Sequence, residues 1–406
     1  MGTEVFFNPF EPGFRDDPYP FYARILEASP RHRSVLGGRV FARYADCAAL
    51  LRHPHMTTGT MLGDEREAIL RAQGMWDVWE HSTVPDFLDT VILLKDPPDH
   101  TRLRTLMGKV FTPRSVEALR PHIAALVGEM LEDVDGALDA VEHLAFPLPA
   151  LVICELLGVP AGEREELKEW SSAAARLLDP IVDRDLFVAA DAALRNFSAY
   201  FSELVAERRA HPRDDLLSQL VHAEEEGQRL TDGELLANMT FLFGAGHETT
   251  QNLIGNALNL LARRPEQYER LRAEPALITN AVEEFLRYEP PVQVTGRTAV
   301  DDIELDGLTV DRGERCILLL AAANRDPERF EEPDRLDVAR PNVRPLSFGG
   351  GIHHCLGAAL ARVEGQEAIG GFVRTFASAE AERDDVDWRE NFTLRGPRAL
   401  PLRVSR

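Results

Sequence analysis

The sequence lacks the features that mark secreted, membrane-spanning or disulfide-rich proteins. It contains only four cysteines, Cys47, Cys154, Cys316 and Cys355, which are too scattered for a disulfide framework or a zinc C-x-x-C pair. The N-terminus has no basic segment followed by an apolar run, unlike a secretory signal. No apolar run approaches the roughly 20 residues that span a bilayer, and the run from Cys316 to Ala323 is far too short. We therefore expect a cytoplasmic protein that does not associate with membranes.

Positive charge is also scarce. The chain has 45 Lys and Arg residues against 67 Asp and Glu residues, so its formal net charge is -22. This balance argues against binding to nucleic acid or to an anionic membrane. The composition, with 44% hydrophobic and 28% charged residues, is that of an ordinary globular protein, and we find no internal repeat or linker. We predict a single domain over residues 1–406 and a monomer.

Most of the sequence has the hydrophobic periodicity of helices. Shorter β-rich stretches run from Ser34 to Tyr44 and from Val294 to Cys316. In the first stretch Gly37 and Gly38 separate two short apolar segments, which is typical of a hairpin. These patterns predict a mainly α protein with small accessory β-sheets.

Residues 56–95 have broken periodicity although they are rich in apolar side chains. They include Met61, Trp76 and Phe87, with Gly63 among the glycines that interrupt the pattern. We predict a partly helical, apolar loop, and such loops often carry binding residues.

A long helix is predicted to begin at Thr231. Thr231 and Glu234 have the spacing of a capping box, and the helical period that follows continues to about Arg264, where Pro265 ends it. About 32 residues at roughly 1.5 Å each give a helix of about 48 Å. A helix of that length can line a central site.

The middle of this helix carries the run from Ala245 to Thr250, with sequence A-G-H-E-T-T. Two small residues leave room for a bulky flat group, and the threonine hydroxyls favour a local widening of the helix. A kinked core helix would account for the same residues. A zinc-peptidase motif H-E-x-x-H is excluded, because Gln251 stands at the position of the second histidine.

A glycine-rich loop from Phe348 to Gly357 presents Cys355 just before a run of strong helix formers. Near a helix N-terminus, unpaired N–H groups and the positive end of the dipole stabilise a thiolate, which is a good ligand for a soft metal. One alternative is an ordinary buried cysteine in a glycine-rich turn. Another is a phosphate-binding loop, but the motif G-x-x-x-x-G-K-[ST] is absent.

A further pair, Glu284 and Arg287, stands at spacing i, i+3, which places both side chains on one helical face. By itself such a pair is most often solvated at the surface.

Together these three motifs resemble the cytochrome P450 family of haem-thiolate monooxygenases. They are A-G-x-E-T-T at 245–250, E-x-x-R at 284–287 and F-x-x-G-x-x-x-C-x-G at 348–357, and the resemblance extends over nearly the whole chain. It implies a triangular, mainly helical fold with small accessory β-sheets. The implied reaction inserts one oxygen atom from O2 into a fairly hydrophobic small organic substrate, by hydroxylation or epoxidation.

The resemblance also implies a role for each motif residue. Cys355 would be the thiolate ligand of heme b, which favours O–O cleavage in this family. Thr249 would hydrogen-bond the dioxygen, and Glu248 would relay protons toward it. A buried structural ion pair would comprise Glu284, Arg287 and Arg340.

Other positions are implied to contact the haem. Four basic side chains would meet its propionates, namely His100, Arg104, Arg297 and His353. The remaining contacts would be Ile92, Leu93, Ala245, Gly246, Phe348, Gly349 and Gly357.

The chain has no flavodoxin-like or ferredoxin-like portion, so electrons would come from a ferredoxin and an NAD(P)H-dependent ferredoxin reductase. Arg102, Lys109 and Arg114 would form a local basic patch for docking. Substrate would contact residues 56–95, 177–197, Phe241, 292–295 and 392–393. The alternatives are a haem-thiolate binding or sensing protein and a peroxide-driven enzyme, and Glu248 and Thr249 argue against both.

Overall fold

The computed structural model describes residues 5–34, 37–59, 67, 70–160, 164–178, 183–224 and 227–406. The chain divides into two compact units. Unit 1 comprises Met1–Met56, Val116–Pro149 and Thr249–Arg406, and unit 2 comprises Thr57–Ser115 and Ala150–Glu248. The boundary falls inside one helix after Glu248, so each unit holds part of the predicted site.

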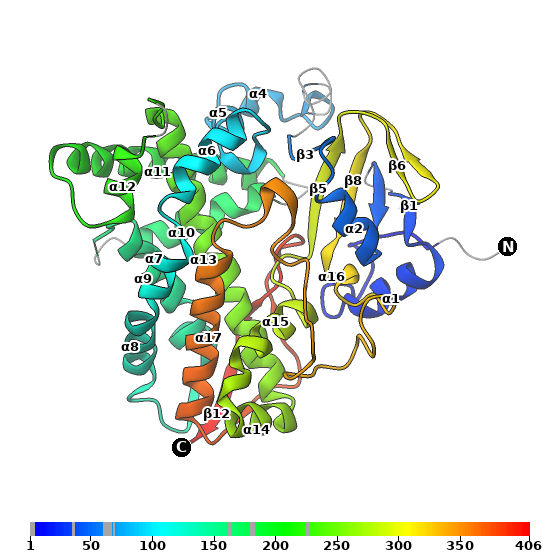
Figure 1. The fold of residues 1–406 in the computed structure, drawn as a ribbon, viewed down its shortest axis with the longest axis vertical. Coiled ribbons are helices and arrows are strands. Elements are labelled where there is room, and N and C mark those ends of the chain that lie inside the picture. Colours follow the sequence, from blue (N-terminus) through cyan, green and yellow to red (C-terminus); the bar gives the residue numbers. More distant parts are fainter. Residues whose placement is uncertain are drawn as a thin grey trace. The chain divides into compact units, whose positions relative to one another are not determined.

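The described residues are mainly helical, as predicted (Figure 1). The α-helices are α1 (Tyr19–Ala28), α2 (Tyr44–Leu50), α4 (Trp76–Trp79), α5 (Val84–Leu88), α6 (Asp99–Gly108), α7 (Pro113–Ala118), α8 (Arg120–Leu131), α9 (Pro147–Leu156), α10 (Arg164–Ala175), α11 (Arg184–Ala210), α12 (Leu216–His222), α13 (Asp232–Ala262), α14 (Pro265–Ala273), α15 (Ile278–Tyr288), α16 (Leu320–Ala323) and α17 (Ala358–Thr375). Shorter helical turns are η1 (Ile92–Leu94), η2 (Val141–Ala145), η4 (Arg176–Leu178), η5 (Pro275–Leu277) and η6 (Gly351–His353).

The strands form small sheets, also as predicted. The largest sheet has the order β1-β2-β8-β5-β3, in which β2 and β8 run parallel while β1 pairs with β2, and β5 with β8, antiparallel. A second sheet has the order β4-β12-β9, and β6–β7 and β10–β11 are two-stranded. The strands are β1 (Arg31–Arg33), β2 (Arg39–Phe41), β3 (Met56–Thr57), β4 (Ala137–Asp139), β5 (Val294–Ala299), β6 (Ile303–Leu305), β7 (Leu308–Val310), β8 (Arg315–Leu319), β9 (Ser378–Ala381), β10 (Asp387–Trp388), β11 (Pro397–Ala399) and β12 (Pro401–Ser405).

The predicted hairpin is confirmed as β1 and β2, with Arg31 opposite Phe41. The main sheet is covered by apolar residues on both faces. Phe41 and Leu318 belong to one core cluster, whereas Val40 and Leu319 belong to another. Neighbouring residues of a strand point to opposite faces, so a sheet buried on both sides requires a continuous apolar run, as in β8.

The predicted long helix is confirmed as α13, and its capping box is present. The Thr231 N–H donates to Glu234 Oε2 at 2.9 Å, and the Glu234 N–H donates to Thr231 Oγ1 at 3.2 Å. The widening that the residues near Ala245 permit is not seen, because α13 is α-helical from Asp232 to Ala262. The helix from Val141 to Ala145 has the wider π geometry instead.

The predicted apolar loop of residues 56–95 is partly helical where it is described, with α4, α5 and η1. Met61 and Gly63 lie outside the described residues. Val84 of α5 is buried in a cluster with Phe187 and Leu194 of α11. The loop is therefore packed onto a helix of unit 2.

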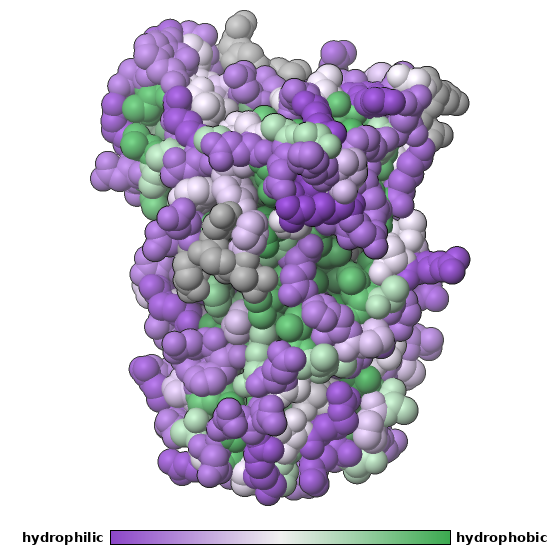
Figure 2. All heavy atoms as spheres, turned by 90° about the vertical axis from the view of Figure 1, so that its left-hand side faces the viewer, coloured by the Kyte–Doolittle hydropathy of each residue, from purple (hydrophilic) through white to green (hydrophobic). Residues whose placement is uncertain are grey.

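Hydrophilic residues cover most of the face drawn in Figure 2, in keeping with the acidic composition. No helix in the described part of the chain has the length and apolar content needed to cross a membrane.

Two glycines at the packing of α8 against α17 have opposite requirements. A Cβ on Gly371 of α17 would lie 2.5 Å from Cγ1 of the buried Val127, whereas a Cβ on the exposed Gly128 of α8 would meet nothing within 4 Å. We predict that Gly371→Ala destabilises the protein by about 1–3 kcal/mol through overpacking. Gly128→Ala should stabilise it by about 0.5–1 kcal/mol, because alanine loses less backbone entropy in a helix.

Thermal unfolding of both variants checks this pair. A Tm that moves in the same direction for both would contradict it.

Candidate functional site

The Cys355 loop has the geometry of a tight, glycine-dependent turn. Gly349 and Gly351 have φ of 68° and 67°, in the left-handed region that side chains disfavour. A Cβ on Gly351 would lie 2.5 Å from the Leu51 carbonyl oxygen. The Cys355 N–H donates to the Phe348 carbonyl at 2.9 Å, which closes the loop three residues before α17 begins. The backbone thus turns Cys355 outward at the start of a helix.

Cys355 is exposed, whereas the other three cysteines are buried. Cys154 and Cys316 are core residues, as expected. Burial raises the pKa of Cys316 to about 12 and that of Cys47 well above its ordinary value, which keeps both thiols protonated. The exposed thiol of Cys355 removes the alternative of an ordinary buried cysteine.

Glu284 and Arg287 form a buried, bidentate ion pair with N–O distances of 2.7 and 2.8 Å. Arg340 lies where the resemblance implies, with its Nε 3.1 Å from Glu284 Oε1. The Glu284 carboxylate also accepts the Asp337 N–H at 3.1 Å. Both side chains of the pair are fully buried, so the surface-pair alternative is wrong.

Two of the implied propionate partners belong to unit 1. Arg297, on β5, is buried, and its guanidinium donates to the Gly296 carbonyl at 2.7 Å and to the Thr295 hydroxyl at 3.4 Å. His353 is half-buried in η6, two residues before Cys355. The main sheet therefore sets the position of the Arg297 backbone, and the Cys355 loop sets that of His353.

The other two partners, His100 and Arg104, lie one turn apart on α6 of unit 2. His100 is buried, and burial together with the charge of Arg104 lowers its pKa, although Asp96 opposes this. The predicted contact of His100 with a propionate stays a prediction.

The A-G-x-E-T-T run occupies consecutive positions in the middle of α13. Ala245, Gly246 and Thr249 are half-buried and Glu248 is buried. The missing Cβ of Gly246 faces Ile153 of α9 at 3.3 Å, so this glycine allows the two helices to approach within unit 2. The close approach adds a packing reason for this glycine, and the expected contact of Ala245 and Gly246 with a cofactor stays a prediction.

Of the predicted basic patch, the structure corrects one member, Arg102. Arg102 forms a bidentate ion pair with Glu234 of α13, and only 24% of its side chain is exposed. The Lys109 ammonium donates to the Glu224 carbonyl at 2.6 Å. Arg102 is therefore engaged within unit 2, whereas Lys109 and Arg114 are both exposed, and their part in docking stays a prediction.

Some residues that position the site were not predicted. Asn324 accepts the Leu346 N–H at 2.8 Å and donates to the Ser347 hydroxyl at 2.9 Å, and that hydroxyl donates to the Leu286 carbonyl at 2.6 Å. This buried network ties the start of the Cys355 loop to α15. Only its polar residues inside apolar runs could have signalled it in the sequence.

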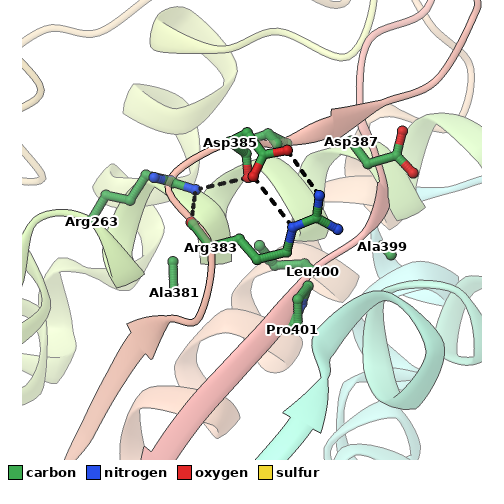
Figure 3. A pocket seen from close by; sticks show the side chains of 9 residues that line it. Arg263, Ala381, Arg383, Asp385, Asp387, Ala399, Leu400 and Pro401 are labelled. Carbon is green, nitrogen blue, oxygen red and sulfur yellow. Dashed lines mark hydrogen bonds and ion pairs between the residues drawn. The ribbon is translucent and has the colours of Figure 1, made fainter.

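A small pocket in unit 1 lies away from these residues. It is lined by Arg263, Arg383, Asp385 and neighbouring strand residues (Figure 3). Arg263 donates to the carbonyls of Arg383 and Asp384 at 2.8 Å each, and Arg383 pairs with Asp385. Its volume of about 20 Å³ admits a water molecule but not an organic substrate.

Known proteins share these features. The family model described as Cytochrome P450 matches residues 62–399. The chain belongs to the cytochrome P450 family. It is 36% identical to the polyketide biosynthesis cytochrome P450 PksS of Bacillus subtilis (strain 168), over 99% of this chain and 100% of that protein. It is 38% identical to the cytochrome P450 monooxygenase PikC of Streptomyces venezuelae, over 97% of this chain and 92% of that protein.

Solved cytochrome P450 structures have the same fold. P450BioI in complex with an acyl carrier protein ligated to hexadec-9Z-enoic acid has a TM-score of 0.87 and 36% identity, covering 97% of this chain and 99% of that one. The protein is therefore a haem-thiolate monooxygenase that uses O2 and an organic substrate.

The residues of this site suit a haem. The exposed thiol of Cys355 is a soft ligand at a helix start, and Arg297, His353, His100 and Arg104 are hydrogen-bond donors of the kind that bind carboxylates. In the described ranges, no group of three His, Cys, Asp or Glu side chains could hold a metal ion.

Glu364, on α17 nine residues after Cys355, is a buried carboxyl that sequence reasoning missed. Burial raises its pKa to about 8, and among the described residues none hydrogen-bonds its Oε2. In the folded protein Glu364 therefore keeps its proton up to about pH 8, whereas in the unfolded chain it releases the proton above about pH 4.5. The contribution of Glu364 to the free energy of unfolding is full below pH 4.5 and is lost as the pH rises toward 8.

Glutamine does not titrate, so we predict that Glu364→Gln removes this pH-dependent loss of stability. Between pH 5 and 8 the free energy of unfolding of the variant should rise relative to that of the wild type, by up to about 1.4 kcal/mol per pH unit. Thermal unfolding across that range measures it. Glu380→Gln, at an exposed position of β9, is the control. Parallel stability curves for wild type and Glu364→Gln would contradict the prediction.

Proposed function

We propose that residues 1–406 form one haem domain in which Cys355 is the thiolate ligand of heme b. The observation that carries the assignment is the exposed thiol of Cys355, which stands in a closed glycine turn at the start of α17. The bound haem supplies the oxidising chemistry, which activates O2 for transfer of one oxygen atom. All other tasks fall to side chains of this chain.

The acid and the hydroxyl of α13 have separate tasks in this proposal. Glu248 relays protons toward the place where O2 reacts, and the Thr249 hydroxyl hydrogen-bonds the dioxygen. Their adjacency on a regular helix supports this division of tasks. Ile92, Leu93, Ala245, Gly246, Phe348, Gly349 and Gly357 contact the haem, and His100, Arg104, Arg297 and His353 bind its propionates.

We propose a long apolar substrate of acyl or polyketide type, which is hydroxylated or epoxidised. Two relatives support this class: the P450BioI structure contains a hexadec-9Z-enoic acid ligated to acyl carrier protein, and the structure of CYP267B1 contains myristic acid. The apolar cluster of Val84, Phe187 and Leu194 beside the predicted substrate loop agrees with it.

Electrons come from a ferredoxin and an NAD(P)H-dependent ferredoxin reductase in this proposal. We further propose a cytoplasmic monomer. Lack of product formation coupled to NADPH consumption would instead favour a sensing protein, and product formed with peroxide alone would favour a peroxide-driven enzyme.

The reduced, carbon monoxide-bound difference spectrum tests the central assignment. We expect a thiolate-type, red-shifted Soret band that Cys355→Ala abolishes, because the axial ligand sets the band position. Cys316→Ala, which removes a buried thiol, should leave the band unchanged. A band that survives in Cys355→Ala would refute the ligand assignment.

The role of Thr249 predicts a different phenotype. Thr249→Ala should keep the thiolate band but lower product per NADPH consumed by about tenfold or more, since general acid–base contributions are typically 10²–10⁴-fold. Thr249→Ser retains the hydroxyl and should restore most of the coupling. The assay uses myristic acid with a surrogate ferredoxin and reductase, and equal coupling in Thr249→Ala and wild type would exclude this role.

A further inference from the structure

The segment from Thr83 to Ile92, which contains α5 and leads into η1, is held at its two ends by side chains of two different helices. At its start, Asp191 of α11 accepts the Thr83 N–H at 2.6 Å and the Thr83 hydroxyl at 2.7 Å. At its end, Asn238 of α13 accepts the Ile92 N–H at 2.9 Å. Thr83, Ile92, Asp191 and Asn238 all belong to unit 2.

The two hydrogen bonds that Asn238 Nδ2 donates determine the orientation of its side-chain amide. Its Nδ2 donates to the Glu234 carbonyl at 2.8 Å and to the Thr90 carbonyl at 3.5 Å, so its Oδ1 must face the Ile92 N–H. The side chain is almost fully buried. Asn238 therefore binds backbone groups on both sides of Val91 and fixes the entry into η1.

Asp191 has a comparable arrangement at the other end. Its second oxygen accepts Arg195 Nε at 2.9 Å, and Arg195 also donates to the His81 carbonyl at 3.0 Å. Burial alone would raise the pKa of Asp191, but the bonds from Thr83 and Arg195 outweigh it and lower the pKa. The carboxylate is thus charged and engaged at neutral pH, and α11 holds the chain on both sides of Ser82.

Between these anchors the segment has only local backbone hydrogen bonds among those described, such as Phe87 N–H to Thr83 O and Val91 N–H to Phe87 O. Val84 packs into the apolar cluster with Phe187 and Leu194. No strand pairing in the described part of the chain includes residues 83–92. Phe87 and Leu88 pack against the same cluster. The position of the segment therefore depends on its two polar anchors and on the apolar packing between them.

We propose that Asp191 and Asn238 are positioning residues that set where the 83–92 segment stands toward the substrate, and thereby determine substrate selectivity. This inference rests on the proposed function, which places Ile92 and Leu93 against the haem and residues 56–95 against the substrate. Asp191 falls within the predicted substrate-contacting stretch 177–197, whereas Asn238 belongs to no predicted site set.

Hydrogen–deuterium exchange of the haem-loaded protein tests the anchoring without any activity. In Asn238→Ala, peptides covering residues 83–92 should exchange about tenfold faster or more near Ile92, because the loss of a buried hydrogen bond shifts local opening by about that factor. Asp191→Ala should have the same effect near Thr83. Asp77→Ala, which removes an exposed ion pair with Arg184 of the same helix α11, is the control and should change nothing there.

Azole titrations followed by the optical shift of the haem test selectivity. The dissociation constant of bulky clotrimazole should rise about tenfold or more in Asn238→Ala and Asp191→Ala, whereas that of imidazole should stay within about twofold. Asp191→Asn keeps an acceptor for Thr83 and should bind clotrimazole like the wild type. Unchanged exchange in both alanine variants, or equal weakening of both azoles, would overturn the proposal.

The two experiments separate this inference from the proposed function. An absent haem spectrum would count against the proposed function, whereas exchange of residues 83–92 reports on the anchors whether or not haem is bound.

Discussion

The buried ion pair between Glu284 and Arg287 is the interaction on which the arrangement of unit 1 depends. Arg287 has no exposed atoms, and beyond Glu284 it donates to the carbonyls of Asn324, Pro333 and Arg335. Removing one partner of a buried pair leaves the other charge uncompensated, at a cost of about 3–5 kcal/mol. The pair therefore joins α15 to the irregular chain from Asn324 to Arg340, and removing either charged side chain destabilises this connection.

The same region positions the candidate ligand loop. Asn324, whose carbonyl accepts from Arg287, binds Leu346 and Ser347, and the loop with Cys355 begins one residue later. Glycines at 349 and 351 then supply the left-handed turns, and the Cys355 N–H closes on Phe348. Successive hydrogen bonds therefore fix the backbone that carries the Cys355 side chain. Such a preorganised loop is what a protein contributes to the chemistry of a bound cofactor.

The substrate-facing candidate in unit 2 is held in another way. Residues 83–92 form no strand and depend on Asp191, Asn238 and the apolar cluster around Val84. The loop of Cys355 is thus held by successive hydrogen bonds close together in the chain, whereas residues 83–92 are held at their ends by side chains of α11 and α13.

Local information was sufficient for several features. The capping box of α13, the hairpin at Gly37 and Gly38 and the turn before Cys355 depend on residues close together in the chain, so the sequence alone determined them, and the motif order identified the family. Tertiary structure alone decided that Gly246 faces Ile153, that Arg102 pairs with Glu234 and that Glu364 is buried as an acid. It likewise brought Asp191 and Asn238 to Thr83 and Ile92 across more than a hundred residues. The reason is that a polar or small side chain has the same local pattern whether its partner is water or a distant segment, and only packing selects between them.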